Sequence, residues 1–258
     1  MAVKPKPHRA RPGSAAGSLD VVQANGRVTA TLNRPAAGNR IGAAIADRLI
    51  ELAEQVEDDD SLKLLAITGI GDSFCTGFED DADQRLVESL AVITKPTIAI
   101  INGDAFDEGL ELAFALDIRV APARARFALT QLTRGVMPHF GGSQRLARLI
   151  GSAQALKMIL TGAAIDGREA MRLGLITYIA DSRGALERCA GEIVQSIISR
   201  APIAMRLAKE AVLKGFDMTL EQGIRLEEDL YALLQTTADR DEGVRAFLEK
   251  RKPLFKGV

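Results

Sequence analysis

Three acidic residues stand close together in a segment that is mostly apolar. Asp107 and Glu108 are followed by Glu111, within the sequence KPTIAIINGDAFDEGLELAFALDIRVA of residues 95–121. Carboxyl groups are rarely buried without a partner, so this polar break is difficult to explain by core packing alone. The segment is therefore the first candidate for a functional site.

The same segment predicts the elements that would position these side chains. Residues 97–101 have the pattern of a buried strand, followed by an Asn-Gly turn, a short helix that begins near Asp107 and a second strand at 117–120. A strand that runs through a turn into a helix brings backbone N–H groups and the positive end of the helix dipole to one place. Such a place can bind an anion, or stabilise an oxyanion that forms during a reaction.

A second loop, at residues 68–81, repeats this order of strand, glycine turn and acidic residues. Its glycines match neither a Walker loop nor a dinucleotide-binding fingerprint, because GK[ST] and GxGxxG are both absent. The loop is either a simple strand-to-helix connection or another anion-binding turn. The repetition of the pattern favours the second interpretation.

Alternating strand and helix patterns in the first two-thirds of the chain predict an α/β core. The predominantly apolar strand at 62–68 indicates a sheet that is covered on both faces. Further elements are expected as strands at 27–33 and 127–129 and as a helix at 41–56.

The last third of the chain is predicted to be helical, with capping signals at Asp166 and Pro202. Helices are expected from residue 143 and at 152–160, 166–173, 184–199, 201–213, 220–236 and 241–250. The predicted organisation is a disordered basic head at 1–18, an α/β core at 19–195 and a helical region at 196–258.

Composition narrows the class of protein. The 258 residues have a formal net charge of −1, and four basic residues lie before the first acidic one, so the remainder is acidic and a poor binder of nucleic acid. No apolar run is long enough to span a membrane. Cys75 and Cys189 are far apart, which favours a reducing cytoplasm, and two histidines with two scattered cysteines predict no metal site.

Several ordered motifs are similar to one known family. They are Leu32-Asn33-Arg34-Pro35, Phe74-Cys75-x-Gly77, Asn102-Gly103, Glu111-Leu112-Ala113, Asp117-Ile118-Arg119, Gly141-Gly142-Ser143-Gln144-Arg145-Leu146 and Phe247-x-x-Lys250-Arg251-x-Pro253-x-Phe255. Together they cover residues from about 20 to 257, and in this order they resemble the enoyl-CoA hydratase/isomerase, or crotonase, family.

The resemblance implies a crotonase-like spiral of repeated ββα units with a C-terminal helical trimerisation region. It also implies an acyl-CoA thioester substrate, no other cofactor, and a homotrimer or hexamer. By position, the backbone N–H groups of Phe78 and Glu108 would form the oxyanion hole that stabilises a thioester enolate. Substrate and CoA contacts are expected from Ala36, Gly38, Thr76, Gly77, Phe255 and Lys256.

The sequence departs from the family pattern at the catalytic positions. Glu111 matches the first of two hydratase glutamates, but the second falls on Gln131, whose amide cannot carry a proton. Asp107 and Glu108 stand where relatives tend to have glycine. Asp107 is either the N-cap of the helix or, like Glu108, a replacement acid/base, and His139 is either a surface residue or a proton carrier.

The function expected from this resemblance is addition of water to a 2-enoyl-CoA, with Glu111 as acid/base and Gln131 as a positioning group. Two alternatives stay open: an enoyl-CoA isomerase or decarboxylase of the same family, which needs only one acid/base, and a non-catalytic acyl-CoA-binding paralogue.

Overall fold

The computed structural model describes residues 18–258, and a six-stranded sheet forms its centre. The order is β1-β2-β3-β5-β7-β10, and only the β1–β2 pair is antiparallel. The strands are β1 (Ser18–Ala24), β2 (Arg27–Asn33), β3 (Leu64–Gly69), β5 (Thr97–Ile100), β7 (Ile118–Pro122) and β10 (Tyr178–Ala180).

A second, smaller sheet lies beside the first and has the order β4-β6-β8-β9. Its strands are β4 (Ser73–Cys75), β6 (Asp104–Phe106), β8 (Arg126–Ala128) and β9 (Ile165–Asp166). β4, β6 and β8 each come directly after a strand of the large sheet, so the chain passes from the large sheet to the small one three times. This arrangement matches the repetition of strand and loop in the sequence.

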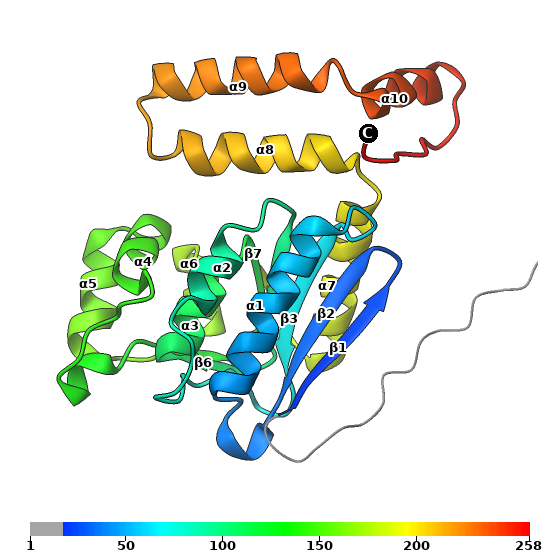
Figure 1. Ribbon diagram of the computed structural model, residues 1–258. Helices are drawn as coiled ribbons and strands as arrows, with labels where there is room; N and C mark the ends of the chain where they lie inside the picture. The colour runs from blue at the N-terminus through cyan, green and yellow to red at the C-terminus, as the bar shows by residue number, and fades with distance from the viewer. Residues whose placement is uncertain (1–17) are drawn as a thin grey trace, which may run out of the picture.

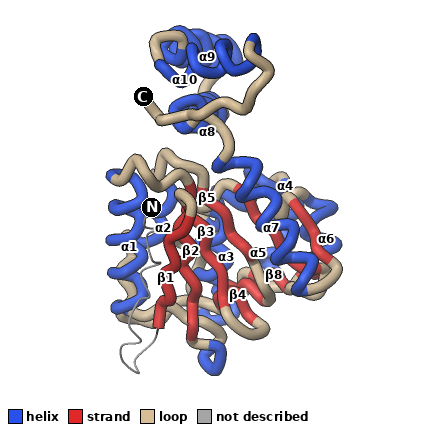
Figure 2. Tube along the Cα trace, turned by 90° about the vertical axis from the view of Figure 1, so that its right-hand side faces the viewer, coloured by secondary structure: helices blue, strands red, loops and turns tan. Residues whose placement is uncertain are grey.

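Helices cover both faces of the large sheet (Figure 2). On β3, Leu65 and Ile67 belong to the hydrophobic cluster shared with α1 (Ala43–Asp58), α2 (Leu86–Ala91) and α3 (Asp107–Phe114). The alternate residues Leu64 and Ala66 belong to a second cluster with α7 (Arg183–Ile198). Because successive strand side chains point to opposite faces, the apolar run at 62–68 is explained by burial on both sides.

Further helices lie between the strands in the sequence. They are η1 (Pro35–Ala37), η2 (Gln131–Arg134), α4 (Gly142–Ile150), α5 (Ser152–Thr161) and α6 (Gly167–Leu173). Asp166 caps α6 by accepting a hydrogen bond from the Glu169 N–H, which confirms the capping signal in the sequence.

The last three helices form an arm, defined here as α8 (Pro202–Gly215), α9 (Leu220–Leu234) and α10 (Ala238–Leu248). The arm stands away from the sheets, with α8 and α9 lying antiparallel (Figure 1). Neither α8 nor α9 contains a buried residue. Among residues 18–258, no helix is long and apolar enough to cross a membrane.

Most predicted elements are confirmed within two or three residues. The sequence analysis missed β1, α2 and β10, as well as the short strands β4, β6 and β9 of the small sheet and the 3-10 helices η1 and η2. β1 is an edge strand, α2 is only six residues long, and β10 is three residues long, so none carries a strong periodic signal. The predicted basic head lies outside the described residues apart from Ser18, where β1 begins. The division of the chain at 195 and 196 stays a prediction.

Candidate functional site

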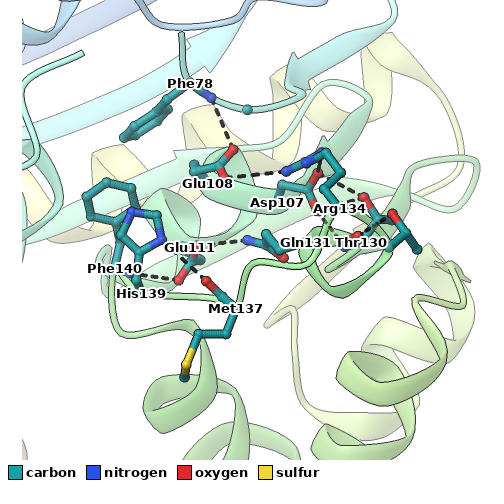
Figure 3. Close-up of polar contacts among 12 residues, drawn as sticks. Phe78, Asp107, Glu108, Glu111, Thr130, Gln131, Arg134, Met137, His139 and Phe140 are labelled. Atoms are coloured by element: carbon teal, nitrogen blue, oxygen red, sulfur yellow. Dashed lines mark hydrogen bonds and ion pairs between the residues drawn. The ribbon is translucent and has the colours of Figure 1, made fainter. Parts of the chain in front are cut away.

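Glu111 lies on α3 and is completely buried. Its Oε1 accepts hydrogen bonds from the backbone N–H groups of Phe140 at 2.9 Å and Gly142 at 2.8 Å. Its Oε2 accepts a hydrogen bond from Gln131 Nε2 at 3.0 Å. Three donors therefore fix the carboxyl group in one orientation (Figure 3).

Burial raises the pKa of Glu111 to about 7, although the two backbone N–H groups act in the opposite direction. The desolvation of the charged form is the largest cause, and His139 lowers the value slightly through its charge. A carboxyl group with a pKa near neutrality exchanges protons readily at neutral pH, which suits a general acid/base.

Gln131 is the first residue of η2 and is also completely buried. The structure brings it to Glu111, as the sequence pattern predicts. Its Nε2 donates to Glu111, while its Oε1 is buried and has no hydrogen-bond partner among the described residues. A buried amide oxygen without a donor is costly, so a water molecule or a substrate hydroxyl would be held well at this atom.

Asp107 fixes the segment that carries Gln131. Its carboxylate accepts hydrogen bonds from the backbone N–H and the hydroxyl of Thr130, the residue before Gln131, and pairs with Arg134 at 3.0 Å. These contacts tie the start of α3 to η2. They also position Gln131 against Glu111.

The prediction that Asp107 is the N-cap of this helix is wrong. The N-cap position is Phe106, and no side chain caps the helix there. Asp107 instead adopts a φ of 48°, in the left-handed region, and its carboxylate points to Thr130. Asparagine and aspartate tolerate this region better than other non-glycine residues, and the bonds to Thr130 and Arg134 stabilise it.

The loop at residues 76–78 lies against η1, so the structure brings these two predicted CoA-binding segments together. The N–H and hydroxyl of Thr76 both donate to the Gly38 carbonyl oxygen, at 3.0 and 3.1 Å. The Ile41 N–H donates to the Gly77 carbonyl at 3.1 Å. That bond polarises the peptide group between Gly77 and Phe78, and so strengthens the Phe78 N–H as a donor.

Glu108 makes a contact that the sequence did not indicate. Its side-chain Oε2 accepts a hydrogen bond from the Phe78 N–H at 3.2 Å, and its Oε1 lies 3.7 Å from Arg134 Nη2. One of the two N–H groups predicted for the oxyanion hole is therefore already hydrogen-bonded to a carboxylate of the same chain (Figure 3).

Aromatic side chains cover this group of residues. The rings of Phe78 and Phe140 are 5.3 Å apart, and the ring of His139 lies 4.1 Å from that of Phe140. His139 itself is exposed, so it lies at the outer side of this cover rather than next to the carboxyl of Glu111. Phe140 was missed in the sequence because it acts through its backbone N–H and its ring. Every residue except proline has such an N–H, and a phenylalanine ring is common in hydrophobic cores, so neither marks a functional residue.

The C-terminal residues lie elsewhere in this chain. The backbone N–H groups of Lys256 and Gly257 donate to the buried carboxylate of Asp239, at 2.6 and 2.8 Å, and Phe255 packs beside Gly243 of α10. The chain end lies beside the start of α8 (Figure 1). The structure thus does not bring Phe255 and Lys256 to the loop at residues 76–78.

Comparison with known proteins gives a consistent result. The family described as enoyl-CoA hydratase/isomerase matches residues 23–258. A 2,3-dehydroadipyl-CoA hydratase of Escherichia coli is 37% identical over 240 residues, covering 88% of this chain and 94% of that protein. An (E)-benzylidenesuccinyl-CoA hydratase of Thauera aromatica is 37% identical over 243 residues, with the same coverage of both chains.

Solved structures agree with the sequence relatives. The enoyl-CoA hydratase of Bacillus anthracis superposes with a TM-score of 0.89 at 34% identity, covering 93% of this chain and 99% of that one. A probable enoyl-CoA hydratase/isomerase of Mycobacterium abscessus gives a TM-score of 0.87 at 28% identity, covering 95% and 100%. The fold is therefore the predicted crotonase fold, and the chain belongs to the enoyl-CoA hydratase/isomerase family.

Proposed function

We propose that this protein adds water to the double bond of a 2-enoyl-CoA, with Glu111 as its single acid/base. The observation that carries the proposal is the environment of Glu111: a buried carboxyl group, fixed by three donors, with a pKa of about 7. A buried carboxyl with a pKa so far from its ordinary value is typical of catalytic positions. Two of the relatives described above are acyl-CoA hydratases by name, which supports hydration.

The reaction can proceed in two steps with one carboxyl group. Water bound at Gln131 Oε1 gives a proton to the Glu111 carboxylate, and its oxygen forms a bond to Cβ of the substrate. The electron pair of the double bond moves to the thioester oxygen, where the backbone N–H groups of Phe78 and Glu108 stabilise the enolate. Glu111 then returns the proton to Cα, so that one water molecule has been added.

Gln131 supports both protonation states of Glu111 in this scheme. Its Nε2 donates to the ionised carboxylate, as observed. When Glu111 is protonated, rotation of the amide by half a turn would present Oε1 to the carboxyl proton instead. Gln131 thus positions the proton without carrying it.

A double-bond isomerase or a decarboxylase of the same family is the second candidate. The observation that favours it is Gln131, because these reactions need only one acid/base and the second carboxyl group is absent here. A non-catalytic acyl-CoA-binding protein is favoured less, because such a role needs no carboxyl group with a pKa near neutrality.

Turnover of a panel of 2-enoyl-CoA thioesters by the full chain tests the proposal, with loss of enoyl absorbance as the rate and mass spectrometry to identify the product. Glu111→Gln should lower kcat by about 10²- to 10⁴-fold, the usual contribution of a general acid/base. Glu54→Gln, on the exposed face of α1, is the matched control and should retain full activity.

A product of unchanged mass would support isomerisation. Loss of CO₂ from a 2-carboxyacyl-CoA, added to the panel for this purpose, would support decarboxylation. If no thioester is converted while CoA still binds, or if Glu111→Gln leaves every measured rate unchanged, the protein is not an enzyme of this mechanism.

We also propose that the functional unit is a homotrimer, alone or stacked as a hexamer. Large apolar side chains on the arm support this, because nothing within the described chain covers them. Exposed apolar patches of this kind mark protein interfaces. A second copy that covers the arm would also bring its own C-terminal residues, Phe255 and Lys256, within reach of the first subunit's loops.

A further inference from the structure

The Glu108 carboxylate lies where the proposed substrate oxygen would bind. Its Oε2 is 3.2 Å from the backbone nitrogen of Phe78, within hydrogen-bonding distance, and the side chain is only 13% exposed. An N–H group has one hydrogen to donate. A thioester oxygen can therefore take a good hydrogen bond from Phe78 only after Glu108 has left it.

The competition is electrostatic as well as steric. An enolate oxygen that develops beside an unmoved carboxylate would meet a like charge, and the repulsion is strong because the Glu108 side chain is largely buried. Gly77 leaves no spare room in this corner, since a Cβ at residue 77 would lie 2.9 Å from Glu108 Oε2 and 2.9 Å from Arg40. Glu108 must consequently swing away from the loop, not deeper into it.

Arg134 is placed to receive the displaced carboxylate. Its Nη2 lies 3.7 Å from Glu108 Oε1. The two groups therefore form an ion pair, but they are too far apart for a hydrogen bond. Its Nη1 is held by Asp107 at 3.0 Å, so the guanidinium is fixed at one end while the other end faces Glu108. Rotation of the Glu108 side chain would shorten this contact into a charge-assisted hydrogen bond, which is stronger than the bond to a neutral amide.

We infer that Glu108 occupies the oxyanion hole before substrate binds, and that Arg134 is the positioning residue that draws it out so that the thioester oxygen can take its place. The inference rests on the proposed function only in requiring an acyl-CoA thioester as ligand, because displacement precedes any chemical step. It gives Arg134, which the family comparison does not single out, a role in binding the thioester group in particular.

Calorimetric binding of butyryl-CoA and of free CoA to the full chain tests this displacement. Both share the nucleotide, but only butyryl-CoA has a thioester oxygen. E108A removes the occupant and should tighten butyryl-CoA binding by about tenfold, the usual worth of one charge-assisted hydrogen bond, while free CoA binding stays unchanged. E79Q is a matched control, because Glu79 lies in the same loop region and pairs instead with Arg34.

Variants of Arg134 separate its proposed role from a purely structural one. R134M should weaken butyryl-CoA binding by about tenfold in the native background, and R134K should recover part of this loss because it keeps the charge. In the E108A background, R134M should change binding by less than about twofold, since no carboxylate is left to move. If Arg134 acts only by holding Asp107, R134M should weaken butyryl-CoA binding equally in the native and E108A backgrounds.

The vibrational frequency of a ¹³C-labelled thioester carbonyl provides a readout of the hole itself. The frequency should fall on binding to the native protein and to E108A, and fall less on binding to R134M. Equal affinities of native protein and E108A for butyryl-CoA, with CoA binding intact, would overturn this inference and leave the proposed function standing. Failure of the native protein to bind either ligand would overturn both.

Discussion

The core, from β1 to α7, and the arm, from α8 to α10, bury their apolar residues in different ways. The core encloses two hydrophobic clusters between sheet and helices, and no arm residue belongs to either cluster. Contacts of α8 with the core include polar pairs, such as Lys209 with Asp117 at 2.7 Å and Arg206 with Glu57 at 3.4 Å. Side chains that the arm leaves exposed include Val212, Leu213, Phe216, Leu220, Tyr231, Leu233, Phe247 and Leu248.

This difference separates two requirements of function. The core alone supplies the buried carboxyl group, its donors and the 76–78 loop, so the proposed chemistry needs nothing from the arm. The arm has an apolar surface that a single chain does not cover, and the C-terminal residues that follow it include the predicted CoA contacts Phe255 and Lys256. We therefore expect catalysis and assembly to respond to different substitutions.

The largest expected effect is on assembly. Phe216 and Leu220 are 67% and 82% exposed, at the turn between α8 and α9. Phe216→Glu combined with Leu220→Glu should convert the proposed trimer into monomers. Each lost apolar contact is worth about 1.5–3 kcal/mol, and the interface would also have to bury a charge. Light scattering coupled to size-exclusion chromatography measures the mass.

The matched control is Arg225→Glu, which reverses a charge at an exposed position of the arm, breaks only the exposed pair with Glu221 and removes no large apolar side chain. It should leave the mass unchanged. If the native protein is monomeric at micromolar concentration, the proposed trimer interface does not exist, and the arm has no role in assembly.

The sequence predicts the fold well where its signals are local. The apolar strand at 62–68, the strand at 27–33 and the cap at Asp166 all have periodic or capping patterns that depend on neighbouring residues only, and all are found. β10 is different, because its three residues form a strand only through pairing with β7, more than fifty residues earlier. The cytoplasmic location inferred from the cysteines stays a prediction.

The site was also predicted only in part, because some of its contacts join residues that are far apart in the sequence. The pairing of Glu111 with Gln131 followed from the ordered family motifs. The role of Asp107 did not, because both a cap and a cross-link to Thr130 are open to an aspartate at that position, and only the positive φ decides between them. The bond from Phe78 to the Glu108 side chain joins residues thirty positions apart and has no local signature.

A second prediction concerns the stability of the core. Burial raises the pKa of Glu111 from 4.5 to about 7, so the folded protein binds this proton more tightly than the unfolded chain does. At low pH the protonated Glu111 does not lower the free energy of unfolding through its ionisation. As pH rises from about 4.5 to 7, keeping Glu111 in the folded protein lowers the free energy of unfolding by up to about 3 kcal/mol. Glu111→Gln should raise the unfolding temperature by roughly 5–10 °C at pH 8 and by much less at pH 5.

Glutamine suits this position structurally as well. Its oxygen can keep the bonds to Phe140 and Gly142. Its amide can donate to Gln131 Oε1 once the Gln131 amide has rotated by half a turn, because Gln131 now presents Nε2 to residue 111. Calorimetric melts at both pH values give the comparison, with Glu54→Gln as the control that should show no such pH dependence. A variant less stable than the native protein at pH 8 would contradict the assigned cost of burying Glu111.

The smallest expected effect tests Gln131. Gln131→Leu keeps the position filled but removes both the Nε2 donor to Glu111 and the Oε1 acceptor proposed for water. Without the donor the ionised form of Glu111 is less stabilised, so its pKa rises and the basic carboxylate appears at higher pH. We expect kcat to fall by about tenfold at pH 7 and the pH profile to move upward. Leu132→Gln, at an exposed neighbour, is the control. Because the change lies in the core, the mass of the assembly should stay constant, and a variant that loses activity only by dissociating would show that core and arm are not independent.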